Sequence, residues 1–132
     1  MCILLVEDEP LIRAIVADEL AFQGFEVCEA ETGDQAAALI ENPPTAFILL
    51  ITDIHMPGQL NGIDVARLMR RRYPPVPIIY TSGRPDVLNA LMPLGPKEVV
   101  VPKPFTPSEL LSVVHRLLKG NHQSPDNRSQ PS

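Results

Sequence analysis

The segment Ile3-Leu4-Leu5-Val6-Glu7-Asp8-Glu9-Pro10 is an apolar run followed directly by three acids and a proline. A short apolar run of this kind is typical of a buried β-strand. Pro10 suits the first turn of a helix, so a strand is predicted to lead straight into a helix. The acids then lie at the carboxyl end of that strand.

Most of the apolar runs in the chain end in residues that can handle phosphate or a metal ion. These runs and the polar residues after them are 3–6 with Glu7 and Asp8, 47–52 with Asp53, 78–80 with Thr81 and Ser82, and 99–101 with Lys103. Only the run 25–30 lacks such an ending. In an open parallel α/β sheet, ligands bind outside the carboxyl ends of the strands. The polar side chains are therefore predicted to share one crevice.

The residues after Pro10 have the spacing of an amphipathic helix. Its buried face is predicted to consist of Leu11, Ile12, Ile15, Val16 and Leu20.

Further helices have recognisable starts. Thr32 with Gln35 and Thr106 with Glu109 have the spacing of capping boxes, and Asn61-Gly62 opens another helix. A short helix is also predicted between Pro85 and Leu91.

Strands and helices therefore alternate along the chain. Strict βα alternation with short links implies parallel strands and right-handed crossovers. The predicted fold is α/β, a three-layer α/β/α sandwich with a five-stranded parallel sheet. The segment from Gly120 to Ser132 is polar and is predicted to be a disordered tail.

The composition is that of one compact domain. The chain has 132 residues and a formal net charge of −5, which disfavours non-specific binding to nucleic acid or to an anionic membrane surface. There is no apolar stretch long enough to span a bilayer and no signal peptide, so a cytoplasmic protein is expected. Cys2 and Cys28 are predicted to be buried, reduced thiols rather than a disulfide.

Four motifs give the chain a family resemblance. They are Leu4-Leu5-Val6-Glu7-Asp8-Glu9-Pro10, Asp53-Ile54-His55-Met56-Pro57-Gly58, Tyr80-Thr81-Ser82-Gly83 and Pro102-Lys103-Pro104-Phe105. In this order and spacing they resemble the receiver domain of two-component response regulators, over residues 2–119. The resemblance implies the flavodoxin-like strand order 2-1-3-4-5.

The resemblance implies that Asp53 accepts a phosphoryl group. A carboxylate is a poor nucleophile toward phosphorus and repels an incoming anion, so the negative charge at Asp53 must first be neutralised. Mg²⁺, which prefers oxygen ligands, would neutralise it. The implied ligands are Asp8 and Asp53 directly, Glu7 through water, and the backbone carbonyl of His55. The imidazole of His55 is not implied as a ligand.

The resemblance also implies roles for two further residues and a partner. Lys103 would pair with Asp53 and later with a phosphoryl oxygen, and Thr81 would donate its hydroxyl to another phosphoryl oxygen. The donor would be a phosphohistidine on a sensor histidine kinase or a histidine phosphotransfer protein. The chain is expected to act by binding, as a phospho-switch, shuttle or sink, and not as an enzyme beyond its own phosphorylation and dephosphorylation.

Several alternatives stay open at this stage. The chain ends soon after its last predicted helix, which favours a stand-alone receiver, but a fragment of a hybrid histidine kinase is also possible. A non-phosphorylated pseudo-receiver is a further alternative, and the complete set of acids, Thr81 and Lys103 argues against it. A flavodoxin-like carrier would need a phosphate-binding loop after the first strand. A phosphatase of the haloacid dehalogenase type would need a second aspartate at the position of His55. One departure from the family pattern is Val100, where many receivers have an aromatic residue.

Overall fold

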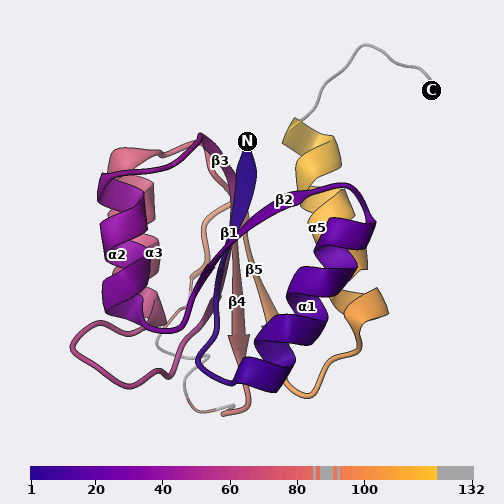
Figure 1. The fold of residues 1–132 in the computed structure, drawn as a ribbon, viewed down its shortest axis with the longest axis horizontal. Helices are drawn as coiled ribbons and strands as arrows, with labels where there is room; N and C mark the ends of the chain where they lie inside the picture. The colour runs from indigo at the N-terminus through magenta and orange to yellow at the C-terminus, as the bar shows by residue number, and fades with distance from the viewer. Residues whose placement is uncertain (85, 87–90, 92, 122–132) are drawn as a thin grey trace.

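The computed structural model describes residues 1–84, 86, 91 and 93–121, and its central sheet lies between two layers of helices (Figure 1). Helices α2 and α3 cover one face of the sheet, and α1 and α5 cover the other. The elements are β1 Cys2–Val6, α1 Pro10–Phe22, β2 Glu26–Ala30, α2 Gly33–Glu41, β3 Phe47–Asp53, α3 Gly62–Arg72, β4 Ile78–Ser82, β5 Glu98–Pro102 and α5 Pro107–Asn121. The predicted three-layer α/β/α sandwich is confirmed.

The five strands are all parallel and are arranged in the order β2-β1-β3-β4-β5, as predicted. The inner strands β1, β3 and β4 are almost wholly buried, because helices cover both of their faces. Strand β2 forms one edge and is half exposed. All carboxyl ends of the strands therefore lie on the same side of the molecule.

Each face of the sheet has its own apolar core. On the α2 and α3 side the largest fully buried side chains include Leu4, Leu50, Met69 and Tyr80. On the α1 and α5 side the core is aliphatic, with Ile3, Leu49 and Ile79 from the strands. None of the helices within the described residues is long and apolar enough to span a membrane.

The predicted buried face of α1 was partly wrong. Val16 and Leu20 are buried, but Leu11 is 73% exposed and Ile15 is 45% exposed. In an α-helix the row that contains residues 11 and 15 is rotated by about 100° from the row 12, 16, 20. The sheet covers the second row only, so the first row keeps its apolar side chains at the surface.

The helix starts agree with the predicted caps. Thr106 and Glu109 form both hydrogen bonds of a capping box, and Asn61 forms another with Asp64. At α2 the Thr32 hydroxyl accepts from the N–H of Gln35, but the Gln35 side chain accepts from Glu31 rather than from Thr32. These local bonds mark the starts of α2, α3 and α5, whereas α1 begins at Pro10 without a side-chain cap.

The ends of two predicted segments differ from the structure or lie outside it. Helix α5 continues past Lys119 to Asn121, so the predicted tail begins with the last residues of a helix. The rest of that tail, residues 122–132, lies outside the described residues. Most of the predicted short helix between Pro85 and Leu91 lies outside them as well.

Candidate functional site

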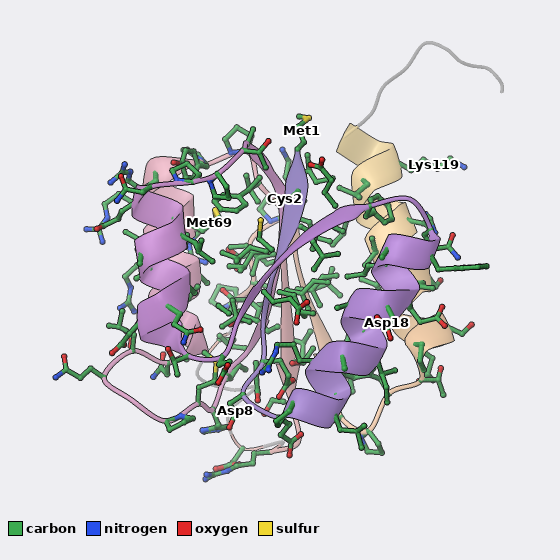
Figure 2. All side chains as sticks on the ribbon, viewed as in Figure 1. Met1, Cys2, Asp8, Asp18, Met69 and Lys119 are labelled. Carbon is green, nitrogen blue, oxygen red and sulfur yellow. The ribbon has the colours of Figure 1, made fainter. Side chains whose placement is uncertain are left out.

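Three carboxylates meet at the carboxyl ends of β1 and β3. Glu7 and Asp8 follow β1, and Asp53 is the last residue of β3. Because these strands are parallel neighbours, the acids lie side by side, and one carboxylate oxygen from each lies within 4.8 Å of the others. Glu7 is only 3% exposed and Asp53 only 6% exposed. Figure 2 shows Asp8 at this end of the sheet.

Lys103, just after β5, supplies a positive charge to this cluster. Its Nζ lies 3.2 Å from Asp53 Oδ2 and 3.1 Å and 3.3 Å from the two carboxylate oxygens of Glu7. A weaker contact of 3.6 Å joins it to the exposed Glu9. One ammonium thus bridges the two buried carboxylates. Lys103 is 96 residues from Glu7 and 50 residues from Asp53 in the chain, so the fold brings together side chains that are remote in the sequence.

The electrostatics of the cluster reflect too many buried negative charges. Burial and the nearby charge of Asp53 raise the pKa of Glu7 to about 7. Burial also raises the pKa of Asp53, and Lys103 only partly opposes this. Burial by itself lowers the pKa of Lys103, but its contacts with Glu7 and Asp53 outweigh burial and raise it. The cluster therefore has room for additional positive charge.

The donor set suits a hard divalent cation. All available side-chain ligands are carboxylate oxygens, and Mg²⁺ prefers oxygen ligands, typically one or two carboxylates with waters. Burial raises the pKa values of Glu7 and Asp53, and the contacts with Lys103 only partly offset this. The residues present therefore fit Mg²⁺.

Thr81 and His55 flank the acids. In the β3–β4 pairing Thr81 lies directly opposite Asp53, and the Thr81 carbonyl accepts from the N–H of Ile54. The N–H of His55 donates to Asp53 Oδ1 over 3.4 Å, while the side chain is exposed. The Ser82 hydroxyl instead accepts from the N–H of Arg84 over 3.0 Å.

Arg13 is a positioning residue that sequence reasoning missed. Its Nη1 donates to the backbone carbonyl of Glu7 over 2.8 Å, and its Nε lies 3.3 Å from Glu29 on β2. The side chain is largely buried. Arg13 thereby ties the acidic loop to the edge strand. An arginine on the first turns of a helix gives no sequence signal for this role, because its acidic partner comes from a different strand.

A second missed residue is Tyr80 on β4. It lies opposite Val100 in the strand pairing, and both side chains pack in the core on the α3 side. Arg70 of α3 donates to the Tyr80 hydroxyl over 3.0 Å and to Glu98 of β5 over 2.7 Å. A buried aromatic ring therefore lies on β4, next to Thr81, whereas position 100 on β5 is a valine. The Tyr80 hydroxyl links β4 to α3, and Arg70 in turn links α3 to β5.

The loop that carries His55 is held against the start of α2. Asp34 accepts from the N–H of Leu60 over 3.2 Å, and Gly33 packs directly against the Leu60 carbonyl group. Gly58 has φ +104°, a left-handed conformation that favours glycine. The loop therefore has a defined path between Asp53 and α3.

Comparison with known proteins agrees with this arrangement of acids, threonine and lysine at the ends of parallel strands. A family model described as the response regulator receiver domain matches residues 3–115. The chain belongs to this family. As a receiver domain it is a module of two-component signalling.

The relatives support the same assignment. The receiver domain is 32% identical over 124 residues to the transcriptional regulatory protein CpxR of Klebsiella pneumoniae, covering 92% of this chain and 51% of CpxR. The chain thus spans about half the length of the curated relatives it matches.

Solved structures show the same fold. A response regulator receiver protein from Sinorhizobium medicae is 30% identical with a TM-score of 0.81, and the match covers 90% of this chain and 94% of that protein. The response regulator TrrA from Thermotoga maritima, solved in complex with Mg(2+)-BeF, is 34% identical with a TM-score of 0.75, over 89% of this chain and 99% of TrrA.

An apolar groove adjoins the acidic site of the receiver domain. It has a volume of about 520 Å³ and lies between α1 and the segment that joins β5 to α5. Its lining includes Ile12, Ile15, Phe105 and, at the edge of the acidic site, Lys103. The groove and the acidic site therefore share a residue.

The crowded acids predict that the stability of the metal-free receiver domain depends on pH. Folded Glu7, with a pKa of about 7, binds its proton more tightly than unfolded Glu7, whose ordinary pKa is 4.5. Stability from this group is therefore present at low pH and is lost as pH rises from about 5 to 7. Urea unfolding in the presence of a chelator should show a loss of about 1–3 kcal/mol over this range.

The Glu7→Gln variant should lose most of this pH dependence because its side chain cannot titrate. Glu41→Gln is the matched control, since Glu41 is exposed at the end of α2. If the free energy of unfolding changed with pH equally in Glu7→Gln and in the control, the assignment of a raised pKa to Glu7 would be contradicted.

Proposed function

We propose that this chain is a phosphoacceptor receiver domain that is phosphorylated on Asp53 in a two-component pathway. The observation that carries the proposal is the buried Asp53 carboxylate with Lys103 at 3.2 Å and two further acids beside it. Three acids that need a cation, next to a lysine that can contact a second anion, form a site for a phosphoryl group and a metal ion together. No simple structural role requires this costly arrangement.

Mg²⁺ is the proposed metal. Asp8 and Asp53 would bind it directly, Glu7 through water, and the backbone carbonyl of His55 would complete the protein ligands. When bound, Mg²⁺ would neutralise negative charge on both the carboxylate and the incoming phosphoryl group. The similarity to TrrA, whose structure contains Mg(2+)-BeF, supports this choice.

The chain's own residues then bind and orient the phosphoryl group. An oxygen of Asp53 attacks phosphorus, an O–P bond forms, and the P–N bond to the donor histidine breaks, leaving the electron pair on the histidine nitrogen. Lys103 exchanges its contact with Asp53 for a phosphoryl oxygen, and Thr81 donates its hydroxyl to another. The burial of Asp53 limits access of water to the acyl phosphate.

The donor is proposed to be a phosphohistidine on a sensor histidine kinase or a histidine phosphotransfer protein. A protein donor must hold its imidazole beside Asp53, and so needs a surface next to the site. The apolar groove meets this need, because Lys103 both lines it and contacts Asp53. Ile15 of α1 lines this groove and is partly exposed, and the exposed Leu11 of the same helix adds to the apolar surface around it.

Ile15→Asp should weaken docking of a protein donor. Burial of an isoleucine side chain contributes about 1.5–3 kcal/mol, so transfer from a phosphorylated histidine phosphotransfer protein should slow by roughly 10-fold or more. Labelling by phosphoramidate, a small phosphodonor, should change far less. Phe22→Asp is the matched control, since Phe22 is 85% exposed at the opposite end of α1. Equal effects of both substitutions would rule out the groove as the docking site.

The direct test of the proposed function is phosphorylation of the wild-type chain. Incubation with phosphoramidate and Mg²⁺ should add the mass of one phosphoryl group, as measured by intact mass spectrometry. The gain should disappear when the metal is chelated and should be reversed by hydroxylamine, which cleaves acyl phosphates. A chain that binds Mg²⁺ but gains no mass would instead be a non-phosphorylated interaction module.

A further inference from the structure

Two cysteine thiols lie in contact at the opposite end of the sheet from the acidic site. The Sγ atoms of Cys2 and Cys28 are 2.8 Å apart, although the residues are 26 positions apart in the chain. They come from neighbouring strands, since Leu4 of β1 pairs with Cys28 of β2. Both thiols are free. Figure 2 shows Cys2 and Asp8 at opposite ends of β1, so this pair is separate from the proposed phosphorylation site.

The two sulfurs differ in their access to solvent. Cys2 is only 1% exposed, on a central strand. Cys28 is half-buried on β2, the edge strand of the sheet. An oxidant can therefore reach Cys28 more easily than Cys2. Cys2 is in turn placed to attack Cys28 from inside the protein.

The geometry favours a bond between these sulfurs over bonds to other thiols. They must approach by less than about 1 Å to reach the roughly 2.05 Å of a disulfide. Strand β2 is paired on one side only, so it can adjust its position more easily than an inner strand. In the reduced state the contact is that of an S–H···S hydrogen bond. Burial, together with this bond to Cys28, raises the pKa of Cys2 to about 12, so Cys2 keeps its proton while both thiols are reduced and is not the thiol that reacts first.

We propose that Cys2 and Cys28 form a reversible redox dithiol, which disulfide oxidants such as oxidised glutathione convert to an intrachain disulfide. The Cys28 thiolate attacks the oxidant, forming a mixed disulfide and releasing one glutathione thiolate. Glutathione on Cys28 removes the thiol–thiol bond that helps to hold the Cys2 proton. Cys2 then loses this proton to water and attacks the Cys28 sulfur as a thiolate, and the second glutathione leaves as a thiolate that takes up a proton. Two protein thiols are oxidised and one glutathione disulfide is reduced to two thiols. A thiol reductant reverses both steps.

The disulfide would tie the edge strand to the centre of the sheet. It would close a loop that contains α1 and the acids Glu7 and Asp8, and cross-linking a loop of this length stabilises a folded chain. Oxidation should therefore raise the thermal midpoint of the chain by roughly 10 °C. Because the bond forms at the far end of β1, it should not block Asp53.

The test is treatment of the full chain with oxidised glutathione, followed by alkylation under denaturing conditions and intact mass measurement. The wild type should lose the mass of two hydrogens, should take up no alkylating agent, and should give a Cys2–Cys28 linked peptide on digestion. Cys2→Ala should stop at a glutathione adduct on Cys28, since the resolving thiol is absent. Cys28→Ala should stay largely unmodified while folded, because Cys2 is buried.

Two outcomes would overturn the proposal. In the first, the wild type accumulates the same glutathione adduct as Cys2→Ala, which would show that Cys2 does not resolve it. In the second, oxidation gives only disulfides between chains. Because the wild-type measurement stands without the variants, it decides the matter even if a substitution impairs folding.

Discussion

Asp53→Asn should abolish phosphorylation of the chain by phosphoramidate. The amide has nearly the shape of the carboxylate but cannot supply the negatively charged oxygen that attacks phosphorus. The loss should be complete within the detection limit of intact mass spectrometry, because Asp53 is the carboxylate that both contacts Lys103 and lies opposite Thr81. The fold should be retained, since the substitution removes one of several crowded negative charges and leaves the backbone unchanged.

Asp18→Asn is the matched control for this substitution. Asp18 lies exposed on α1, well away from the acidic cluster (Figure 2), so this variant should be labelled like the wild type. A full mass gain in Asp53→Asn would mean that another residue accepts the phosphoryl group, and the proposed role of Asp53 would be abandoned.

Gly62→Ala should cause the largest loss of stability among single-methyl additions at the site. A Cβ at this position would overlap the Asp53 carbonyl oxygen and would lie 2.8 Å from both the Asp53 carbonyl carbon and Ile54 Cα. These are backbone atoms of Asp53 and Ile54, so a side-chain rotation cannot relieve the overlap. The N–H of Gly62 also donates to the Ile54 carbonyl, which keeps the two segments together.

The expected cost of Gly62→Ala is about 2–4 kcal/mol in urea unfolding. Phosphorylation should slow as well, because any relief of the overlap moves Asp53. Gly83→Ala is the control, since among the described residues its Cβ would meet the Cβ of Lys103 at 3.8 Å, an ordinary van der Waals contact. The free energy of unfolding of this variant should stay within about 1 kcal/mol of that of the wild type. If the two variants were equally stable, the close packing of α3 on the end of β3 would not be required for the stability of the fold.

The parts of the fold that depend on neighbours in the chain were readable from the sequence. Apolar runs predicted all five strands, and the cap at Thr106–Glu109 is formed by hydrogen bonds between residues three positions apart. The convergence of the acids with Lys103 was also predictable, because parallel strands place their carboxyl ends at one edge of a sheet. That rule needs only the order of elements, and not their detailed packing.

Tertiary structure decided which side chains from separate elements meet. The contact of Arg13 with Glu29, the link from Arg70 to Tyr80, and the approach of Cys2 to Cys28 each join two elements whose relative positions no local pattern specifies. The exposure of Ile15 has the same origin, because an apolar periodicity shows that a helix has a buried face but not how far the sheet extends beneath it. The sequence alone therefore determined the elements and the edge at which the site lies, since these follow from local pattern and strand direction. Only the packed structure determined the groove, the ion pair of Arg13 with Glu29 and the thiol contact, since these depend on the distances between elements that are remote in the chain.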